Sequence, residues 1–368
     1  MTDLTMSSCG MPPLSLDPAR PLSHFEFWPG EAFYAPIALY ALWLGFRYGF
    51  RSSTCANPTI EAGGLVGESK SAVLSLATGD ACDWIAPWTS IVRGTGDSAT
   101  EADRAEAALR AANLPYPVVA KPDLGCRGMG VRPIASRDEL LAYLDSFPHG
   151  QRLVLQTLID WEPEASVLWA RGPNDLQGRI LSLTLKYFPR VTGDGMRTLR
   201  QLIEADPRAG KVAHLYLARH AARLDEVIAA GEQVRLVFSG SHSKGAIFRN
   251  GKHFATEALA RRLDAIANDV PGLHVARFDV RCASIAQLAM GEGFRIVEIN
   301  GVGGEAIHVW DSRTRLLTAW RDLCAQTRTS YVIGAANRAR GAKPLSWSRL
   351  YFLWRRHLRL KTAFPTTA

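Results

Sequence analysis

The sequence predicts an α+β fold with more than one lobe. Helical and strand patterns are mixed along a chain of 368 residues, a length that suits two or three lobes. Several predicted strands also follow one another in the sequence, which favours α+β lobes over one doubly wound parallel sheet. The composition, 47% hydrophobic with 31 Gly and 20 Pro, is that of a folded globular protein.

The elements are assigned in chain order from hydrophobic periodicity. The chain is expected to begin with a flexible leader over residues 1–23, then a hydrophobic helix and a glycine-rich loop within 24–69. Strands are expected at 84–92, 115–122, 152–159, 179–188, 274–281 and 294–300, with a hairpin at 232–254. Helices are expected at 69–79, 99–113, 136–147, 193–207, 255–270, 311–337 and 347–360.

The longest apolar stretch, residues 32–46, is shorter than the roughly 20 residues of a membrane span, and Pro36 interrupts it. We expect a buried helix there, with an interfacial or re-entrant segment as the alternative. The six cysteines form no C-x-x-C pair, and the N-terminal residues lack the pattern of a secretory signal. These features predict a cytoplasmic protein with free thiols and no zinc site.

The net charge of +8 is concentrated at the C-terminal end, where residues 313–368 hold ten Arg and two Lys against one acid, Asp322. Aromatic residues interleave with arginines over 347–359, a pattern typical of helices at anionic membrane interfaces. Peripheral contact with the inner face of the membrane is therefore the favoured interpretation. A solvated helix packed on the core is the second, and nucleic-acid binding is the least favoured.

A glycine-rich loop follows a predicted strand in the segment PVVAKPDLGCRGMGV, residues 117–131. The strand delivers Lys121, and Gly125, Gly128 and Gly130 would let backbone N–H groups approach phosphate oxygens. The spacing fits neither a P-loop nor a Rossmann fingerprint. A plain glycine turn is the alternative to a phosphate site.

Acidic side chains interrupt two apolar strands near the C-terminal part of the fold, in ARFDVR and FRIVEIN. Period-two alternation puts Arg277 with Asp279 on one face, and Glu298 with Asn300 on one face. Buried acids are costly unless paired or metal-bound, and Mg²⁺ prefers such oxygen ligands. The alternative is a structural ion pair of Arg277 with Asp279 or Glu298.

In this order, these motifs resemble the ATP-grasp superfamily, and within it the D-alanine–D-alanine ligase-like carboxylate–amine ligases, over about residues 68–305. The resemblance implies two α+β lobes that clamp ATP. The small lobe would span 70–155 and the large lobe 156–310, with a basic helical region at 311–368. The separate N-terminal domain of the family would be reduced to residues 24–69.

The resemblance also implies site residues. Arg277 would stabilise an acyl-phosphate intermediate and Gly303 and Gly304 would offer N–H groups to an oxyanion. One or two Mg²⁺, with Mn²⁺ as an alternative, would bind Asp279, Glu298 and Asn300. Contacts to ATP would come from Lys70, Lys121, Gly125, Gly128, Gly130, Gln156, Thr157, Leu158, Ile159, Glu164 and Lys186.

The activity implied is the ATP-dependent joining of a small-molecule carboxylate to an amine through an acyl phosphate. An ATP-grasp phosphotransferase or carboxylate–thiol ligase is the second possibility. A catalytically silent, membrane-associated ATP-binding module is the third. The identities of the carboxylate and the nucleophile stay open.

Two polar loops are weaker candidates for substrate contacts. The first carries Asn57, Glu61 and Glu68, with a structural turn in which Glu68 caps the next helix as its alternative. The second carries His242, Ser243 and Lys244, which could contact phosphate or carboxylate or form an exposed polar turn.

Overall fold

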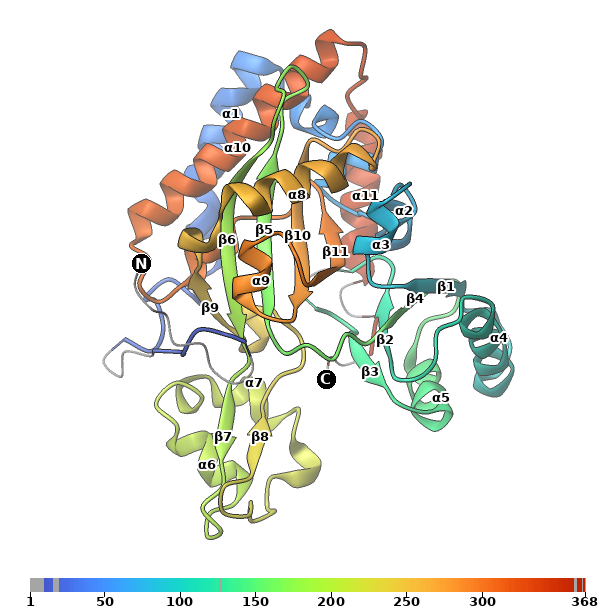
Figure 1. Ribbon diagram of the computed structural model, residues 1–368, viewed down its shortest axis with the longest axis vertical. Coiled ribbons are helices and arrows are strands. Elements are labelled where there is room, and N and C mark those ends of the chain that lie inside the picture. The colour runs from blue at the N-terminus through green and yellow to red at the C-terminus, as the bar shows by residue number, and fades with distance from the viewer. Residues whose placement is uncertain (1–9, 16–19, 126–127, 361–362, 366, 368) are drawn as a thin grey trace.

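Two antiparallel sheets dominate the computed structural model, which describes residues 10–15, 20–125, 128–360, 363–365 and 367 (Figure 1). The smaller sheet has the order β1 (Trp88–Val92), β4 (Arg152–Thr157), β2 (Val118–Pro122) and β3 (Arg132–Ile134). The larger has the order β11 (Phe294–Asn300), β10 (Val275–Cys282), β5 (Glu164–Ala170), β6 (Arg179–Tyr187) and β9 (Ile247–Asn250). The expected α+β class with two lobes is confirmed. The leader expected at 1–23 lies partly outside the described residues.

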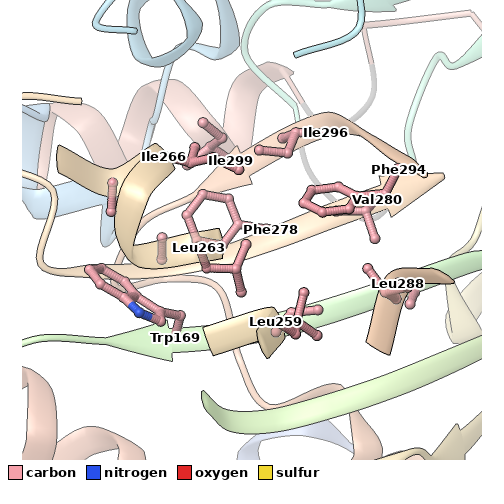
Figure 2. Packing of buried hydrophobic residues seen from close by; sticks show 14 of the residues in the cluster. Trp169, Leu259, Leu263, Ile266, Phe278, Val280, Leu288, Phe294, Ile296 and Ile299 are labelled. Carbon is pink, nitrogen blue, oxygen red and sulfur yellow. The ribbon is translucent and has the colours of Figure 1, made fainter. Parts of the chain in front are cut away.

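The larger sheet is apolar on one face and polar on the other. Helices α8 (Glu257–Asn268) and α9 (Ile285–Ala289) cover the apolar face, where Leu263 and Leu288 meet Phe278, Val280 and Trp169 (Figure 2). Because side chains alternate along a strand, the same strands present their polar residues to the opposite face. That opposite face provides one wall of the candidate site.

The smaller sheet packs on helices α4 (Ser98–Ala111) and α5 (Arg137–Ser146). Both helices begin at a residue that caps them: Asp97 accepts from the Thr100 N–H, and Ser136 from the Glu139 N–H. Short helices α2 (Lys70–Leu74) and α3 (Ala81–Trp84) lead into this lobe and pack against β11. The strand expected at 84–92 is therefore confined to β1.

A third unit projects from the larger lobe and was not expected as such. It pairs β7 (Arg190–Thr192) with β8 (Gln233–Arg235) and carries α6 (Leu199–Ala205) and α7 (Ala213–Leu217) (Figure 1). The hairpin expected at 232–254 is wrong, because β9 pairs with β6 and not with β8. The residues between β8 and β9 cross from this unit back to the large sheet.

The two ends of the chain pack against each other. Helix α1 (Gly30–Tyr48) lies beside α10 (Leu316–Ala339), and α11 (Trp347–Leu360) follows α10 (Figure 1). The inner side of α1 buries Phe33 and Leu44, but its outer side is exposed, so the expectation of a buried helix is only half correct. In the described part of the chain, no helix has the length and apolarity to cross a membrane.

We expect Gly334→Ala to destabilise the fold. Gly334 lies where α10 crosses the 3₁₀ turn Ser52–Cys55, and a Cβ there would collide with the Ser52 carbonyl oxygen. Overpacking of this kind costs about 1–3 kcal/mol in the free energy of unfolding, which urea denaturation would measure. The control is Gly30→Ala in α1, whose Cβ would approach nothing closer than 4.0 Å. Equal stabilities of the two variants would contradict the packing described here.

Candidate active site

A cavity of about 440 Å³ lies between the two sheets and takes in most of the predicted site. This volume is in the range of small-ligand sites. Its walls include Val119 from β2, Phe238 from the crossing loop and Ile307 from the segment after β11. The predicted residues that line it are Lys70, Lys121, Gly125, Gly128, Gln156, Thr157, Leu158, Ile159, Glu164, Lys186, His242, Arg277, Asp279, Glu298, Asn300 and Gly303.

An irregularity in strand β11 orients the side chain of Glu298 toward this cavity. The register with β10 pairs Asp279 with Glu298 but Val280 with Ile296, so Val297 is an extra residue, a β-bulge. Without it, strict alternation would place Glu298 on the face of Ile296, which is in the core. The bulge therefore brings Glu298 to the same face as Asp279. The expectation that both acids lie together on neighbouring strands is confirmed.

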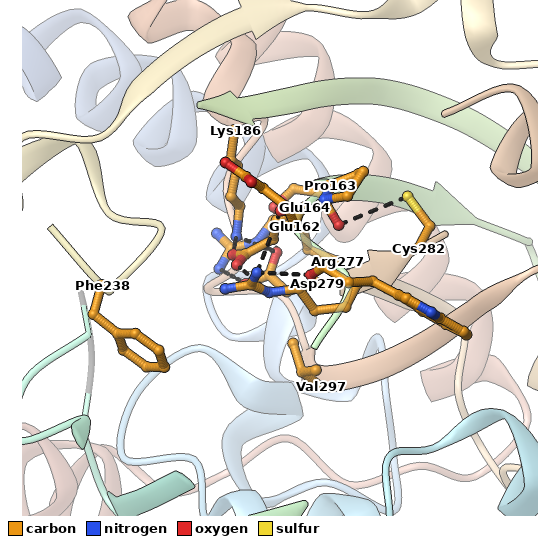
Figure 3. Close-up of polar contacts among 12 residues, drawn as sticks. Glu162, Pro163, Glu164, Lys186, Phe238, Arg277, Asp279, Cys282 and Val297 are labelled. Carbon is orange, nitrogen blue, oxygen red and sulfur yellow. Dashed lines mark hydrogen bonds and ion pairs between the residues drawn. The ribbon is translucent and has the colours of Figure 1, made fainter. Parts of the chain in front are cut away.

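A buried ion-pair network forms the floor of the cavity (Figure 3). Glu164 accepts from Lys186 Nζ at 2.9 Å and forms an ion pair with Arg281 Nε at 3.0 Å. Asp279 pairs with Arg277 at 3.1 Å and with Lys186 at 3.4 Å. Burial opposes ionisation of Asp279, but Arg277 and Lys186 outweigh it and lower its pKa to about 2. Lys186, placed between two carboxylates, has a raised pKa despite burial.

Two lysines approach the cavity from its other side. Lys121 Nζ on β2 donates to Gln156 Oε1 at 2.5 Å and to the Val297 carbonyl at 2.9 Å, which bridges the two lobes. Burial lowers the pKa of Lys121 to about 8; the carboxylate of Glu298 opposes the shift and the charge of Lys70 adds to it. Lys70 Nζ lies 3.3 Å from Glu298 and donates to the Gly125 carbonyl at 2.9 Å.

The described residues of the glycine-rich loop contribute Gly125 and Gly128 to the lining of the cavity. Gly128 has φ of +70°, and a Cβ there would collide with Ser239 on the facing loop, so this position requires glycine. Gly130 does not line the cavity; its carbonyl accepts from Tyr143 Oη at 2.8 Å. Thr367 Oγ1 donates to the Gly128 carbonyl at 2.9 Å, which places Thr367 on this loop.

The side-chain oxygens on β10 and β11 meet only some of the requirements of a divalent-cation site. Glu298 has Lys70 as its ion-pair partner, and Asn300 Nδ2 is a buried polar atom without a hydrogen bond. Asp279 accepts from Arg277 and from Ser166 Oγ, so its oxygens are already engaged, as in the structural alternative considered above. Among the described residues, no three His, Cys, Asp or Glu side chains form a metal-binding group. Mg²⁺ in phosphate sites uses one or two protein carboxylates with phosphate oxygens, and Glu298 with Asn300 suits that mode.

The structure does not support Gly303 and Gly304 as oxyanion donors. The Gly303 N–H donates to the Gly64 carbonyl at 2.8 Å, and the Gly304 N–H donates to the Gly301 carbonyl at 2.9 Å. Gly304 instead allows a close approach, because a Cβ there would press on the Cβ atoms of Arg277 and Asn300. The expectation is corrected: these glycines shape the loop and have no N–H to offer.

A second cavity of about 330 Å³ adjoins the first and shares Lys70, Glu298 and Asn300 with it. Its other walls are the loop 64–68 and α11, which contributes Leu353, Arg356, His357 and Leu360. Glu68 lines this cavity and accepts from the Gly301 N–H at 3.0 Å. It does not cap α2, since Ser69 does so.

The other substrate candidates have mostly structural partners. Asn57 is fully buried, and its amide bonds backbone atoms of Gly63, His274 and Val275, so the structural-turn interpretation holds for it. Glu61 pairs with Arg349 at 2.6 Å, outside both cavities.

In the second candidate loop, His242 lines the first cavity and stacks on Trp310 with ring centroids 4.5 Å apart. Ser243 and Lys244 belong to the same 3₁₀ turn but do not line either cavity.

Sequence reasoning missed several residues that line the first cavity, among them Tyr34, Arg281 and Glu305. Tyr34 donates to Glu305 at 2.6 Å, a contact between segments 271 residues apart. No local pattern signals such a pair. Arg281 could have been found, since it continues the alternation of Arg277 and Asp279 along β10.

Comparison with solved structures finds similarities at low sequence identity and low TM-score. A bifunctional glutathione synthetase from Pasteurella multocida shares 15% identity at a TM-score of 0.34 and matches 69% of this chain and 35% of its own. The VanG D-Ala:D-Ser ligase from Enterococcus faecalis shares 13% identity at a TM-score of 0.41, and the match covers 74% of this chain and 63% of the ligase. D-alanine–D-alanine ligase from Bacillus anthracis shares 12% identity at a TM-score of 0.35, and the match covers 73% of this chain and 71% of the ligase.

The chain thus spans about a third of the glutathione synthetase and under two thirds of the D-Ala:D-Ser ligase. No protein-family model matches the sequence, and no curated protein is similar to it. Similarities this distant carry no conclusion about substrate or reaction.

Proposed function

We propose that this protein is an ATP-dependent carboxylate–amine ligase that works through an acyl-phosphate intermediate. The observation that carries the proposal is the single cavity in which Lys70, Lys121 and Lys186 approach the carboxylates of Asp279 and Glu298. Lysines suit phosphate oxygens, and oxygen ligands suit the Mg²⁺ that accompanies a nucleotide.

The adenine would lie between Val119 and the segment 156–159, where β4 ends. The backbone of Thr157 to Ile159 would offer hydrogen bonds to its edge. The side chain of Gln156 is not available to the adenine, because its Oε1 accepts from Lys121 and its Nε2 donates to the Ala86 carbonyl at 2.9 Å. It acts by holding Lys121 in place. Glu164 stands where a ribose contact is expected, but its salt bridges make it a support for Lys186.

The phosphates would extend from Lys121 toward Lys70 and Lys186, under Gly125 and Gly128. Glu298 and Asn300, with Asp279 beside them, would hold Mg²⁺. The metal would supply charge neutralisation for phosphoryl transfer. The protein contributes fixed charges in a buried site, so little reorganisation accompanies the reaction.

The organic substrates would enter the second cavity, which opens onto the first at Lys70 and Glu298. There a substrate carboxylate oxygen attacks the γ-phosphorus, the bond to the β-phosphate breaks, and ADP leaves. An amine then attacks the acyl carbon, loses a proton, and displaces inorganic phosphate. Arg277, fixed by Asp279, is placed to neutralise negative charge as it develops on the acyl group.

The decisive experiment combines purified protein, Mg-ATP, one carboxylate labelled with heavy oxygen, and one amine from a panel. We expect ADP, an amide, and one labelled oxygen in the released inorganic phosphate, because that oxygen passes through the acyl phosphate. A phosphorylated product without free phosphate would instead show a phosphotransferase. A product only with thiols would show a thiol ligase. ATP binding without ADP under every combination would support the silent module.

A further inference from the structure

Helix α1 presents an apolar stripe to solvent. Leu39, Leu42, Trp43 and Phe46 follow the spacing i, i+3, i+4, i+7 of one helix face. They are 69%, 50%, 55% and 75% exposed, although the opposite side of the helix packs on α10. Phe50 continues the stripe beyond the helix and contacts Phe46 with ring centroids 4.8 Å apart. Contiguous exposed apolar surface of this kind marks an interaction site.

Helix α11 has two distinct faces. Leu353 and Leu360 belong to the inner face, which forms a wall of the second cavity. The outer face exposes Trp347, Tyr351, Trp354 and Leu358 at the spacing i, i+4, i+7, i+11. A helix that only packed on the core would need no aromatic stripe on its solvent side.

The two stripes meet at the start of α11. The Arg51 guanidinium lies 5.5 Å from the Trp347 ring centroid and donates to the Leu345 carbonyl at 2.7 Å. Arg51 follows Phe50 directly in the sequence, so the α1 stripe runs into the α11 stripe. We call the residues of both stripes, together with Phe50, the apolar ridge.

The charge next to the apolar ridge is positive. Arg47, Arg338, Arg355 and Arg359 are exposed on the helices that carry or adjoin it. Arg355 and Arg359 have no ion-pair partner within the described residues. Aromatic and aliphatic side chains flanked by arginines match the interface of an anionic bilayer. The rings enter the headgroup region and the guanidinium groups pair with phosphates.

We propose that the apolar ridge docks this protein on an anionic lipid surface, with α1 and α11 lying in the interface. The inner face of α11 lines the second cavity, so docking would place that cavity directly behind the lipid-facing helix. The exposed α1 stripe supports this docking independently of the basic composition of the C-terminal region.

The test is sedimentation of the full chain with vesicles of phosphatidylcholine alone or with about 30% phosphatidylglycerol. We expect binding to the anionic vesicles only, weakened at high salt. Leu39→Ser/Trp43→Ser/Phe46→Ser and, separately, Arg355→Gln/Arg359→Gln should each lower partitioning at least tenfold, because both apolar burial and charge contribute. All five residues are exposed, so circular dichroism melts should match the wild type.

The matched control is Leu176→Ser, which removes an apolar side chain that is 97% exposed in another part of the molecule. It should bind vesicles like the wild type. Three results would overturn the proposal: no binding to anionic vesicles, equal loss in the control, or a dimer in sedimentation velocity that the α1 variant abolishes. The last would show that the ridge joins two copies of the chain.

Discussion

Glu298→Gln should lower the rate of ADP formation by about 10³-fold, the loss of several kcal/mol of transition-state charge stabilisation. The substitution keeps the shape of the side chain but removes a carboxylate from the proposed cation site. Glu298 is partly exposed and has Lys70 as its ion-pair partner, so the fold should tolerate the change. The defect should appear in kcat, and excess Mg²⁺ should restore it only in part.

The control for this experiment is Glu257→Gln, which alters an exposed acid on α8 with an i, i+4 partner, Arg261. It should keep the wild-type rate and the wild-type Mg²⁺ dependence. A wild-type rate in Glu298→Gln would instead mean that β11 does not hold the cation. Asp279→Asn is a poorer test, because it would leave Arg277 and Lys186 buried without their carboxylate.

Lys121→Met should weaken Mg-ATP binding by roughly 10- to 100-fold, since hydrogen bonds to charged groups contribute about 1.5–3 kcal/mol. Because the pKa of Lys121 is lowered to about 8, its charge is present below that pH and lost above it. The wild-type Kd should therefore be nearly constant up to about pH 7 and rise as pH passes through 8. Calorimetric titrations at several pH values would measure this.

In Lys121→Met the rise above pH 8 should be absent, because the titrating group is gone. Lys121→Arg should bind ATP with no rise in this range, since arginine keeps its charge. Lys252→Met, which removes an exposed lysine outside both cavities, should reproduce the wild-type curve. A wild-type slope in Lys121→Met would assign the titration to another group.

The site was predictable where chemistry is local. Glu298 with Asn300, and Arg277 with Asp279, were correctly assigned to shared faces from alternation alone. The face itself was not predictable: it depends on the bulge at Val297, and no residue type in FRIVEIN signals an extra residue. The glycine loop was found by its composition. The Gly303 N–H was misjudged because its acceptor, the Gly64 carbonyl, lies far away in the sequence, and the Gly304 N–H because a local turn bonds it to the Gly301 carbonyl.

The fold, too, was predictable where the sequence signal is local and not where it depends on contacts between distant segments. Strand β5, at the centre of the large sheet, was missed because both its faces are buried and the polar–apolar alternation of EASVLWA stops at Leu168. The 232–254 hairpin was wrong because proximity in sequence favours local pairing, whereas β9 pairs with β6 across the third unit. For α1, the outer side could not be told from a core face, because both are apolar.

The pairing of α1 with α10 also bears on how the chain is made. Trp320 Nε1 on α10 donates to the Phe33 carbonyl on α1, across 287 residues of sequence. A ribosome releases α1 long before α10 exists, so the inner face of α1 stays uncovered until α10 has been synthesised. Its outer face is apolar as well, so the nascent helix exposes hydrophobic side chains on both faces. A chaperone, or an early encounter with lipid, would then protect it until α10 emerges.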